Sequence, residues 1–355
     1  MRGMKRSDRL MLGWVARRLF SKRVASEHGG GHPDRLLLVR VDERVGNMII
    51  LQPIIEAINS QWPSCEIGLM CSSRMEQVVS SLDGISRVHP LDKRWFFKHH
   101  FRWRKVIEDC RKVGYQVAID ASAWHEYSFT HAALTYYSGA PERIAFSRDG
   151  SLSGFHTHLV DPGEPDEHEL VQRMRLLVPL GIEMSPPKLR TNLGKASADK
   201  FSHWLQSLKV NAPRIGIWAG GRKQQRRWPV PFYVQLARSL QQKFGATIIV
   251  LWGPGEEYIR DALTMALPYQ TVAAPKTDLD ELAGIMRNLD LVVTNDTGPM
   301  HLCVACEVST VTIFASGSPS RWGHPYEFVR NLSCPGSDPA EIKMAMDACI
   351  ELLTD

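Results

Sequence analysis

The residues best suited to do chemistry lie in one stretch, DLVVTNDTGPMHLCVA, at positions 290–305. Its apolar run at 291–294 predicts a short buried strand, and a polar turn then leads to Gly298 and Pro299. That pair is typical of a helix start, with glycine at the cap and proline at the first helical position, because proline's missing N–H would have no partner there. A helix that begins directly after a buried strand presents free N–H groups and its positive dipole end, which suits a phosphate or diphosphate.

Polar side chains occur at the same point of the chain. Asp296 and Thr297 come between the predicted strand and helix, and His301 falls within the helix's first turn. These side chains would add hydrogen bonds to a bound diphosphate. The same residues also fit an ordinary strand-to-helix connection capped by threonine and glycine, so the choice depends on the rest of the chain.

Two other loops follow predicted strands in the second half. After the strand at 214–218 come two glycines and a basic run that includes Arg226, which fits either a solvated charge run or an ordered diphosphate loop. The Trp-Pro pair directly after the run favours an ordered loop. After the strand at 246–252 comes Gly-Pro-Gly with Glu256 and Glu257, where a carboxylate would hold a sugar hydroxyl or cap the next helix. Ligands of open α/β sheets bind at the carboxyl ends of the strands, so three such loops in one sheet predict a nucleotide-sugar site.

The composition limits the classes of protein. The chain has 355 residues, 44% of them hydrophobic, which supports two domains with proper cores. The net charge is +5, but residues 1–23 hold eight Lys or Arg and one Asp, so the remaining 332 residues carry −2. A nearly neutral body with a basic leader lacks the charged face of a nucleic-acid binder, and no nucleic-acid partner is expected.

The leader has an apolar stretch at 10–16 that two arginines follow. The stretch is too short to span a bilayer, and the arginines stand where a signal peptidase site would be, so we reject a signal peptide. The apolar residues of 10–20 can share one helical face, which suits peripheral contact of residues 1–23 with the inner membrane. A disordered tail, or an arm packed on the body, fits the leader equally well.

The seven cysteines are odd in number and scattered, which indicates a reducing compartment and hence a cytoplasmic protein. Cys303 and Cys306 have a redox or zinc spacing, but they fall inside the predicted helix, and the sequence has no second pair at ligand spacing. We expect no metal and no cofactor.

Strands and helices alternate in two series, and the strands are continuous aliphatic runs, as in parallel sheets covered on both faces. We therefore predict an α/β fold of two Rossmann-like domains that face each other across a cleft. The first series has strands at 36–41, 66–70, 87–90 and 116–120 and helices at 48–61, 74–82, 102–113, 127–138 and 167–180. The second series has strands at 214–218, 246–252, 291–294 and, as the last strand, 311–314, with helices at 229–244, 256–266, 279–288 and 338–353 besides the one that begins at 298.

The predicted domains follow from this alternation. A basic amphipathic leader and linker occupy 1–34, an N-terminal domain 35–186 and a C-terminal domain 187–336, and a C-terminal helical segment occupies 337–355. Residues 147–166 read as a long loop because they hold several Gly, Pro, Ser and Asp.

These motifs resemble those of a known family. The string TNDTGPMHL at 294–302, with PSRWG at 319–323 and RRWP at 226–229, is similar to the ADP-heptose:lipopolysaccharide heptosyltransferases of glycosyltransferase family 9. WGPGE at 252–256 and VRVDERVG at 39–46 fit the same family. The resemblance covers about residues 35–350, and TNDTGPxHL with the later RWG is its specific part.

The resemblance implies an inverting transferase of the GT-B fold. The N-terminal half would hold a lipid-linked oligosaccharide acceptor, and the C-terminal half an ADP-sugar donor. The C-terminal helix would cross back onto the first domain. The positions that match donor-binding residues are Arg226, Glu256 or Glu257, Asp296, Thr297 and Gly298, and we add His301 to them.

The chain departs from the family at one important point. The family usually has Gly-Asp at the start of the first helix, and that aspartate is the proposed general base, but this chain has Gly46 and Asn47. An amide cannot accept the proton, so the base must lie elsewhere or be lost. Asp42 and Glu43 on the same loop are the candidates, and loop solvation explains both equally simply.

The sequence thus predicts transfer of a heptose, or a related sugar, from an ADP-activated donor to a lipopolysaccharide core acceptor. Two alternatives stay open: a non-catalytic homologue that binds a nucleotide-sugar or glycolipid and has lost its base at Asn47, and another enzyme of two Rossmann-like domains, such as a nucleotide-sugar epimerase.

Overall fold

The computed structural model of the protein describes residues 32–92, 100–125, 128–147, 153–183, 188–208, 210 and 212–354. The chain forms two compact units, and it passes from the first to the second between Lys188 and Leu189. The short segment Arg44–Ile50 also groups with the second unit. The basic leader, its glycine linker and the predicted boundary between 186 and 187 lie outside the described residues, so the predicted membrane contact stays a prediction.

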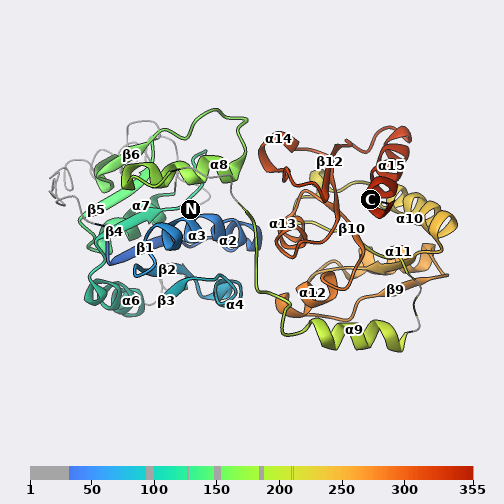
Figure 1. Ribbon diagram of the computed structural model, residues 1–355, viewed down its shortest axis with the longest axis horizontal. Helices are drawn as coiled ribbons and strands as arrows, with labels where there is room; N and C mark the ends of the chain where they lie inside the picture. Colours follow the sequence, from blue (N-terminus) through green and yellow to red (C-terminus); the bar gives the residue numbers. More distant parts are fainter. Residues whose placement is uncertain are drawn as a thin grey trace. The chain divides into compact units, whose positions relative to one another are not determined.

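The first unit is built on a sheet of six described strands, all parallel, in the order β3-β2-β1-β4-β5-β6 (Figure 1). The strands are β1 (Arg35–Arg40), β2 (Glu66–Ser72), β3 (Ile85–Leu91), β4 (Val117–Asp120), β5 (Glu142–Phe146) and β6 (His158–Val160). Its helices are α3 (Gln52–Gln61), α4 (Glu76–Val79), α6 (His100–Val113), α7 (Phe129–Tyr137) and α8 (Glu169–Met174), with 3₁₀ turns at Ser73–Met75, Ser153–Phe155 and Arg175–Leu180.

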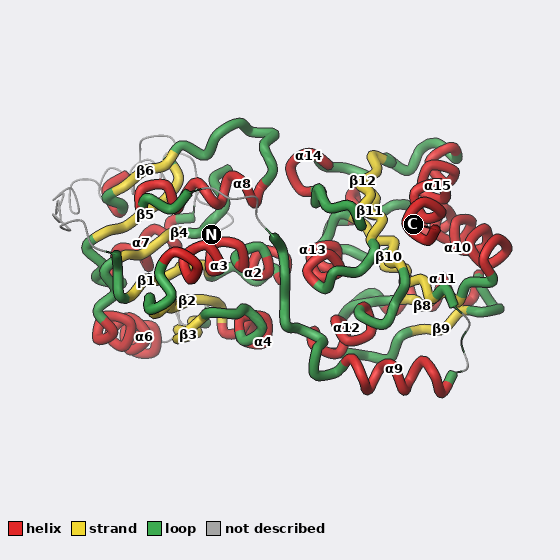
Figure 2. The backbone as a smooth tube through the Cα atoms, in the orientation of Figure 1, coloured by secondary structure: helices red, strands yellow, loops and turns green. Residues whose placement is uncertain are grey.

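The second unit repeats the design, with six described parallel strands in the order β12-β11-β10-β7-β8-β9. Figure 2 labels these strands except β7. The strands are β7 (Arg214–Trp218), β8 (Thr247–Val250), β9 (Thr271–Ala273), β10 (Leu291–Asn295), β11 (Thr310–Phe314) and β12 (Val329–Ser333). The helices are α2 (Val45–Ile49), α9 (Ala198–Ser207), α10 (Val230–Phe244), α11 (Glu257–Ala266), α12 (Leu279–Met286), α13 (Gly298–Ala305), α14 (Pro319–Trp322) and α15 (Ala340–Thr354), and a 3₁₀ turn spans Gln224–Arg226.

The two sheets confirm the predicted fold class, an α/β protein with two Rossmann-like domains. Every residue of β10 is buried, and so is every residue of β1 after the first. A strand that is covered on both faces by helices needs a continuous apolar run, which is the pattern that predicted these strands.

Several element predictions were wrong, and most of the errors have a local cause. Strands β5, β6, β9 and β12 and helix α9 were not predicted, and 311–314 is therefore not the last strand. The sheet-edge strands β6, β9 and β12 are short or only partly buried, so they carry no continuous apolar run. The predicted helix at 48–61 is two helices, α2 and α3, because Pro53 in the first turn of α3 cannot donate a helical hydrogen bond.

Helix α15 belongs to the packing of the second unit. Its Ala345, Ala348 and Cys349 are buried in that unit's hydrophobic core, and the helix packs against α10. The predicted separate segment at 337–355 is therefore part of the second unit's core. Its crossing back to the first domain stays a prediction.

Candidate functional site

Three loops of the second unit come together at the carboxyl edge of its sheet. They follow β7, β8 and β10, which are neighbours in the strand order. The backbone N–H of Gly221, after β7, donates to Glu256 Oε1 at 2.6 Å, and that of Gly253, after β8, donates to Glu256 Oε2 at 3.0 Å. The convergence predicted from the sequence is present.

Glu256 and Glu257 differ sharply, which the sequence could not show. Glu256 caps α11 and is only partly exposed, whereas Glu257 is the exposed first residue of that helix. A side chain at Gly220 would overlap the Glu256 carboxylate, so the glycine leaves room for this contact. Glu256 therefore ties the loop after β7 to the loop after β8.

An ion pair joins the loop after β7 to the end of β10. Arg226 donates to Asp296 Oδ2 at 2.7 Å, and the exposed fractions of the two side chains are 29% and 3%. Burial raises the pKa of Asp296, and the charges of Arg226 and Lys223 oppose that rise. The buried carboxylate thus fixes a guanidinium group that still reaches solvent.

Helix α13 and its cap lie one residue earlier in the chain than the sequence predicted. Thr297 is the cap residue, Gly298 the first helical residue and Pro299 the second. The Thr297 side chain makes no capping hydrogen bond to the helix, and its hydroxyl donates to the Asn295 carbonyl oxygen at 3.3 Å. A Cβ at Gly298 would meet no atom closer than 3.6 Å. The start of α13 therefore has room for a Cβ at Gly298, which would contact Gly46 of α2, and it has no side-chain cap.

His301 lies on the buried side of α13. Its Nδ1 is 2.8 Å from Nε2 of His324, and both rings are buried. On its other side lies Gly46 of α2, where a Cβ would come 2.5 Å from His301 Cδ2. The structure thus places His301 in a packed histidine pair beneath the helix start, and His324 and Gly46 are contacts that the sequence did not reveal.

Asn295 is the buried residue that the sequence analysis missed. Its Oδ1 accepts from the Trp228 backbone N–H at 2.8 Å and from the Tyr233 hydroxyl at 3.0 Å. Its Nδ2 donates to the carbonyl oxygens of Ala219 and Gly220, each at 2.9 Å. All four hydrogen-bonding positions of the amide are used, so Asn295 fixes both ends of the loop that carries Arg226.

The Trp228 ring extends this network to the last helix. Its Nε1 donates to Glu341 Oε2 at 2.8 Å. The Glu341 carboxylate also accepts from the backbone N–H groups of Gly336, Ser337 and Asp338, just before α15. The loop is therefore attached at one side to β10 and at the other to the start of α15.

The comparisons with known proteins decide the family. The model of glycosyltransferase family 9 (heptosyltransferase) matches residues 103–343, more than half of the chain. This chain belongs to that family. Lipopolysaccharide heptosyltransferase 1 of Pseudomonas aeruginosa is 22% identical over 303 residues, which is 81% of each chain.

Solved structures show the same fold. The glycosyl transferase family 9 protein of Veillonella parvula aligns with a TM-score of 0.78 and 17% identity, over 90% of this chain and 97% of that one. The E. coli heptosyltransferase WaaC with ADP aligns with a TM-score of 0.72 and 18% identity, over 90% of this chain and 99% of that one. Family 9 membership makes this chain a glycosyltransferase.

The two candidates for the base of this family 9 enzyme are held differently. Asp42 pairs with Arg40, whose side chain is 2% exposed. Glu43 accepts from the Ser72 hydroxyl and from Arg74, each at 3.2 Å, and its side chain is 35% exposed. Asn47 lies on α2, next to the Gly46 that packs against α13. Glu43 is the more accessible carboxylate.

Cys303 and Cys306 do not have the character of a redox pair. Burial raises the pKa of both thiols, that of Cys306 to about 12, whereas reactive CxxC cysteines have lowered pKa values. The Cys303 thiol donates to the Met286 sulfur at 3.6 Å. Among the described residues no group of three His, Cys, Asp or Glu is arranged to hold a metal ion. The described helices also include none that is long and apolar enough to cross a membrane.

Proposed function

We propose that this family 9 enzyme transfers a heptose from ADP-heptose to the core of lipopolysaccharide. Support comes from the family and from its relatives: lipopolysaccharide heptosyltransferase 1 of P. aeruginosa is similar over 81% of the chain, and the WaaC structure that shares the fold contains ADP. A related sugar, or another hydroxyl of the core, fits the same family.

The observation that carries the proposal is the Asp296–Arg226 pair beside the start of α13, which has no side-chain cap. The pair presents a fixed guanidinium at the point where the helix offers backbone N–H groups and its positive dipole end. Guanidinium and helix start both favour a diphosphate. Arg226, Asp296, Thr297 and Gly298 are thus proposed to hold the diphosphate of the donor.

The reaction is an in-line displacement at the anomeric carbon. The acceptor hydroxyl oxygen forms the new bond to that carbon, the bond from the carbon to the diphosphate oxygen breaks, and ADP departs with the electron pair. A protein carboxylate takes the hydroxyl proton. Arg226 and the α13 dipole stabilise the negative charge that grows on the diphosphate, an electrostatic role in which the protein's own groups act on the leaving group.

Glu43 is our candidate for the carboxylate that takes the proton. Asp42 is already committed to the buried Arg40, and taking it away would leave a buried cation without its partner. Glu43 contacts the exposed Arg74, an ion pair that can be exchanged at low cost, and the hydroxyl of the buried Ser72. Asn47, at the position of the family's aspartate, is proposed to orient the acceptor or the donor sugar by hydrogen bonds.

Glu256 is proposed to hold the nucleotide side of the site by joining the loops after β7 and β8. Its carboxylate has lone pairs beyond the two that accept from Gly221 and Gly253, and these suit ribose hydroxyls. The exposed Glu257 provides a matched control, because it is the next residue and carries the same charge.

The test is calorimetric titration with ADP, followed by a transfer assay with ADP-heptose and a lipopolysaccharide core that lacks its heptose. We expect ADP to bind with a dissociation constant between about 1 µM and 1 mM, the usual range for substrates. Glu256→Gln should weaken ADP by about tenfold, and Glu257→Gln should leave it unchanged. Binding of another nucleotide in preference to ADP would overturn the donor assignment.

The alternative of a non-catalytic homologue, which Asn47 raised, is not kept, because family 9 membership makes this chain a glycosyltransferase. Such a homologue would bind ADP without transfer to any heptose-deficient core. The cytoplasmic location, which rests on the scattered cysteines, and the peripheral contact of residues 1–23 with the inner membrane, which rests on the basic leader, are further proposals. Deletion of residues 1–23 tests the membrane contact: the shortened enzyme should lose affinity for vesicles that contain anionic lipid and keep its ADP binding.

A further inference from the structure

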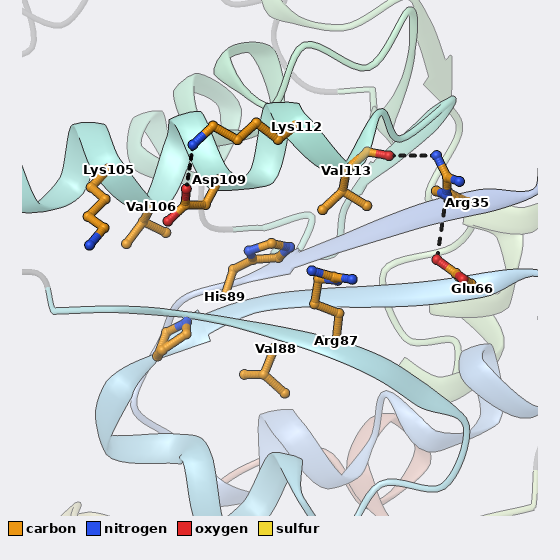
Figure 3. A pocket seen from close by; sticks show the side chains of 11 residues that line it. Arg35, Glu66, Arg87, Val88, His89, Lys105, Val106, Asp109, Lys112 and Val113 are labelled. Atoms are coloured by element: carbon orange, nitrogen blue, oxygen red, sulfur yellow. Dashed lines mark hydrogen bonds and ion pairs between the residues drawn. The ribbon is translucent and has the colours of Figure 1, made fainter.

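The first unit contains a pocket of about 810 Å³ between the edge strand β3 and helix α6 (Figure 3). One end of this pocket lies at the amino edge of the sheet, because Arg35 and Glu66 are the first residues of β1 and β2. The base candidates Asp42 and Glu43 follow the opposite, carboxyl end of β1. The pocket also extends along β3 to Pro90, and neither Asp42 nor Glu43 is among its lining residues.

The side chains around the pocket carry an excess of positive charge. Four cations line it, Arg35, Arg87, Lys105 and Lys112, against two carboxylates, Glu66 and Asp109. Arg35 lies 3.5 Å from Glu66, and Lys112 donates to Asp109 at 3.1 Å. Among the described residues, neither Arg87 nor Lys105 has a carboxylate within ion-pair distance. These two cations come from different elements, β3 and α6, and line the same space (Figure 3).

Besides its charged residues, the pocket is lined by the buried His89, which a hydrogen bond to Tyr115 holds in place. His89 is 6% exposed, and its Nε2 lies 2.8 Å from the Tyr115 hydroxyl. A side chain at Gly68 of β2 would overlap that hydroxyl, so the glycine makes room for Tyr115. Burial and the nearby Arg87 lower the pKa of His89, so the imidazole is neutral near pH 7 and offers a hydrogen bond without charge.

We propose that this pocket binds a phosphate monoester or a diphosphate, with Arg87 and Lys105 as the cations that pair with it. Arg87 and Lys105 are two unneutralised cations that line one pocket, and such a pair fits a group with two or more negative charges. The volume lies within the range of small-molecule sites, which run from about 300 to 1,000 Å³. The phosphate belongs either to the headgroup of an acidic glycolipid or to a free phosphorylated compound, and both offer the same chemistry to these residues.

Another explanation of Arg87 has to be tested against this one. Strand β3 forms the edge of its sheet, and charged side chains on edge strands prevent pairing with other chains. On that explanation Arg87 and Lys105 are solvated charges and bind no particular anion.

The experiment titrates the full-length Arg226→Ala variant, whose donor site is impaired, with inorganic pyrophosphate by calorimetry. A parallel titration uses the wild type. We expect saturable pyrophosphate binding in both proteins. Loss of ADP binding with retained pyrophosphate binding would affect the proposed function alone, so the two proposals fail separately.

Variants on one helix give the matched control. Lys105 lines the pocket, whereas its exposed neighbour Arg104 does not, and each change to Gln removes one positive charge. We expect Lys105→Gln and Arg87→Gln to raise the dissociation constant of pyrophosphate by about tenfold each, and Arg104→Gln by less than twofold. Equal effects of Lys105→Gln and Arg104→Gln, or no saturable binding in the wild type, would overturn the proposal.

Vesicles distinguish the two sources of the phosphate. Phosphatidic acid carries a phosphate monoester headgroup, and phosphatidylglycerol carries a phosphodiester. Binding to phosphatidic acid that pyrophosphate displaces, and that Arg87→Gln reduces while binding to phosphatidylglycerol is unchanged, assigns the pocket to a lipid headgroup. Pyrophosphate binding that Arg87→Gln weakens, with no effect of this change on either vesicle, assigns it to a free phosphorylated compound.

Discussion

The amide oxygen of Asn295 accepts a hydrogen bond from the backbone N–H of Trp228 at 2.8 Å, across 67 residues of sequence. Asn295 ends β10 and directly precedes Asp296, while Trp228 closes the basic loop that carries Arg226. Two consecutive residues at the end of β10 therefore act on this loop: the Asn295 amide holds its backbone, and the Asp296 carboxylate holds its guanidinium. The position of Arg226 depends on both contacts.

Replacement of Asn295 should loosen this loop. In Asn295→Ala the buried N–H of Trp228 and the carbonyl oxygens of Ala219 and Gly220 lose their partner, which should cost about 2–4 kcal/mol of unfolding free energy. The Michaelis constant for the donor should rise by tenfold or more. Tyr233→Phe is the control, because it removes one hydrogen bond of about 1 kcal/mol and leaves the loop contacts in place.

Chemical denaturation gives the free energies of this pair of variants, and donor titration gives the Michaelis constants. A drop in stability with an unchanged Michaelis constant in Asn295→Ala would mean that the amide supports the core and does not position the loop.

Asp296→Asn should change the pH dependence of the unfolding free energy and should also abolish transfer. Burial raises the pKa of Asp296 above its ordinary value, so the folded protein holds this proton more tightly than the unfolded chain does. As pH rises from about 4 through the folded pKa, the unfolded chain loses the proton first, and the unfolding free energy therefore falls over this interval. Above the folded pKa the effect is constant.

The asparagine variant lacks this titration, so its unfolding free energy should vary less between pH 4 and pH 7 than that of the wild type. Arg226 is 29% exposed and keeps access to water, which limits the cost of losing its partner. Transfer should be abolished, because the guanidinium is no longer fixed. Thermal unfolding across this pH range and the transfer assay check both expectations. A variant that keeps full transfer activity would remove Asp296 from the donor site.

Two glycines give a prediction that separates packing from ligand approach. A Cβ at Gly298 would meet no atom closer than 3.6 Å, so Gly298→Ala should leave the melting temperature nearly unchanged. A methyl group at the first residue of α13 should nevertheless obstruct a diphosphate and raise the Michaelis constant for the donor by tenfold or more. Gly46→Ala is the counterpart: its Cβ would lie 2.5 Å from His301 Cδ2, and such overpacking costs about 1–3 kcal/mol.

Differential scanning fluorimetry measures the melting temperatures of the two glycine variants, and donor titration measures their Michaelis constants. If Gly298→Ala is as active as the wild type, the diphosphate does not approach the backbone there.

The strand and helix at 291–305 were predictable because their signals are local. A continuous apolar run marks a doubly covered strand, and Gly298 with Pro299 marks the helix start within one residue. The role of Asn295 was not predictable in this way, since its partners lie 62 to 76 residues away. For the same reason the sequence could not separate Glu256 from Glu257. Glu256 differs by its contact with Gly221 in the loop after β7, which lies 35 residues away in the sequence.

Helix α9 and strands β9 and β12 show a second limit. Only Phe201 and Leu205 of α9 are buried, and β9 is three partly buried residues, so neither carries the apolar density on which the predictions relied. Strand β12 pairs with β11 through its backbone while its side chains are mostly only partly buried. Pairing of this kind depends on the neighbouring strand and leaves little trace in the segment's own residues.

The identity of the base can be tested through Glu43 and Asn47. Glu43→Gln should lower kcat by a factor of 10² to 10⁴, the usual range for a general base, with little change in the melting temperature. Asp42→Asn should instead lower the melting temperature, because Arg40 is 2% exposed and loses its counter-ion.

Asn47→Asp alone should change kcat by less than threefold, since the wild type already has its base. In the Glu43→Gln background the same change should restore part of the lost rate, because it supplies a carboxylate at the position of the family's aspartate. A gain of more than tenfold from Asn47→Asp in the wild type would show instead that Glu43 is not an effective base.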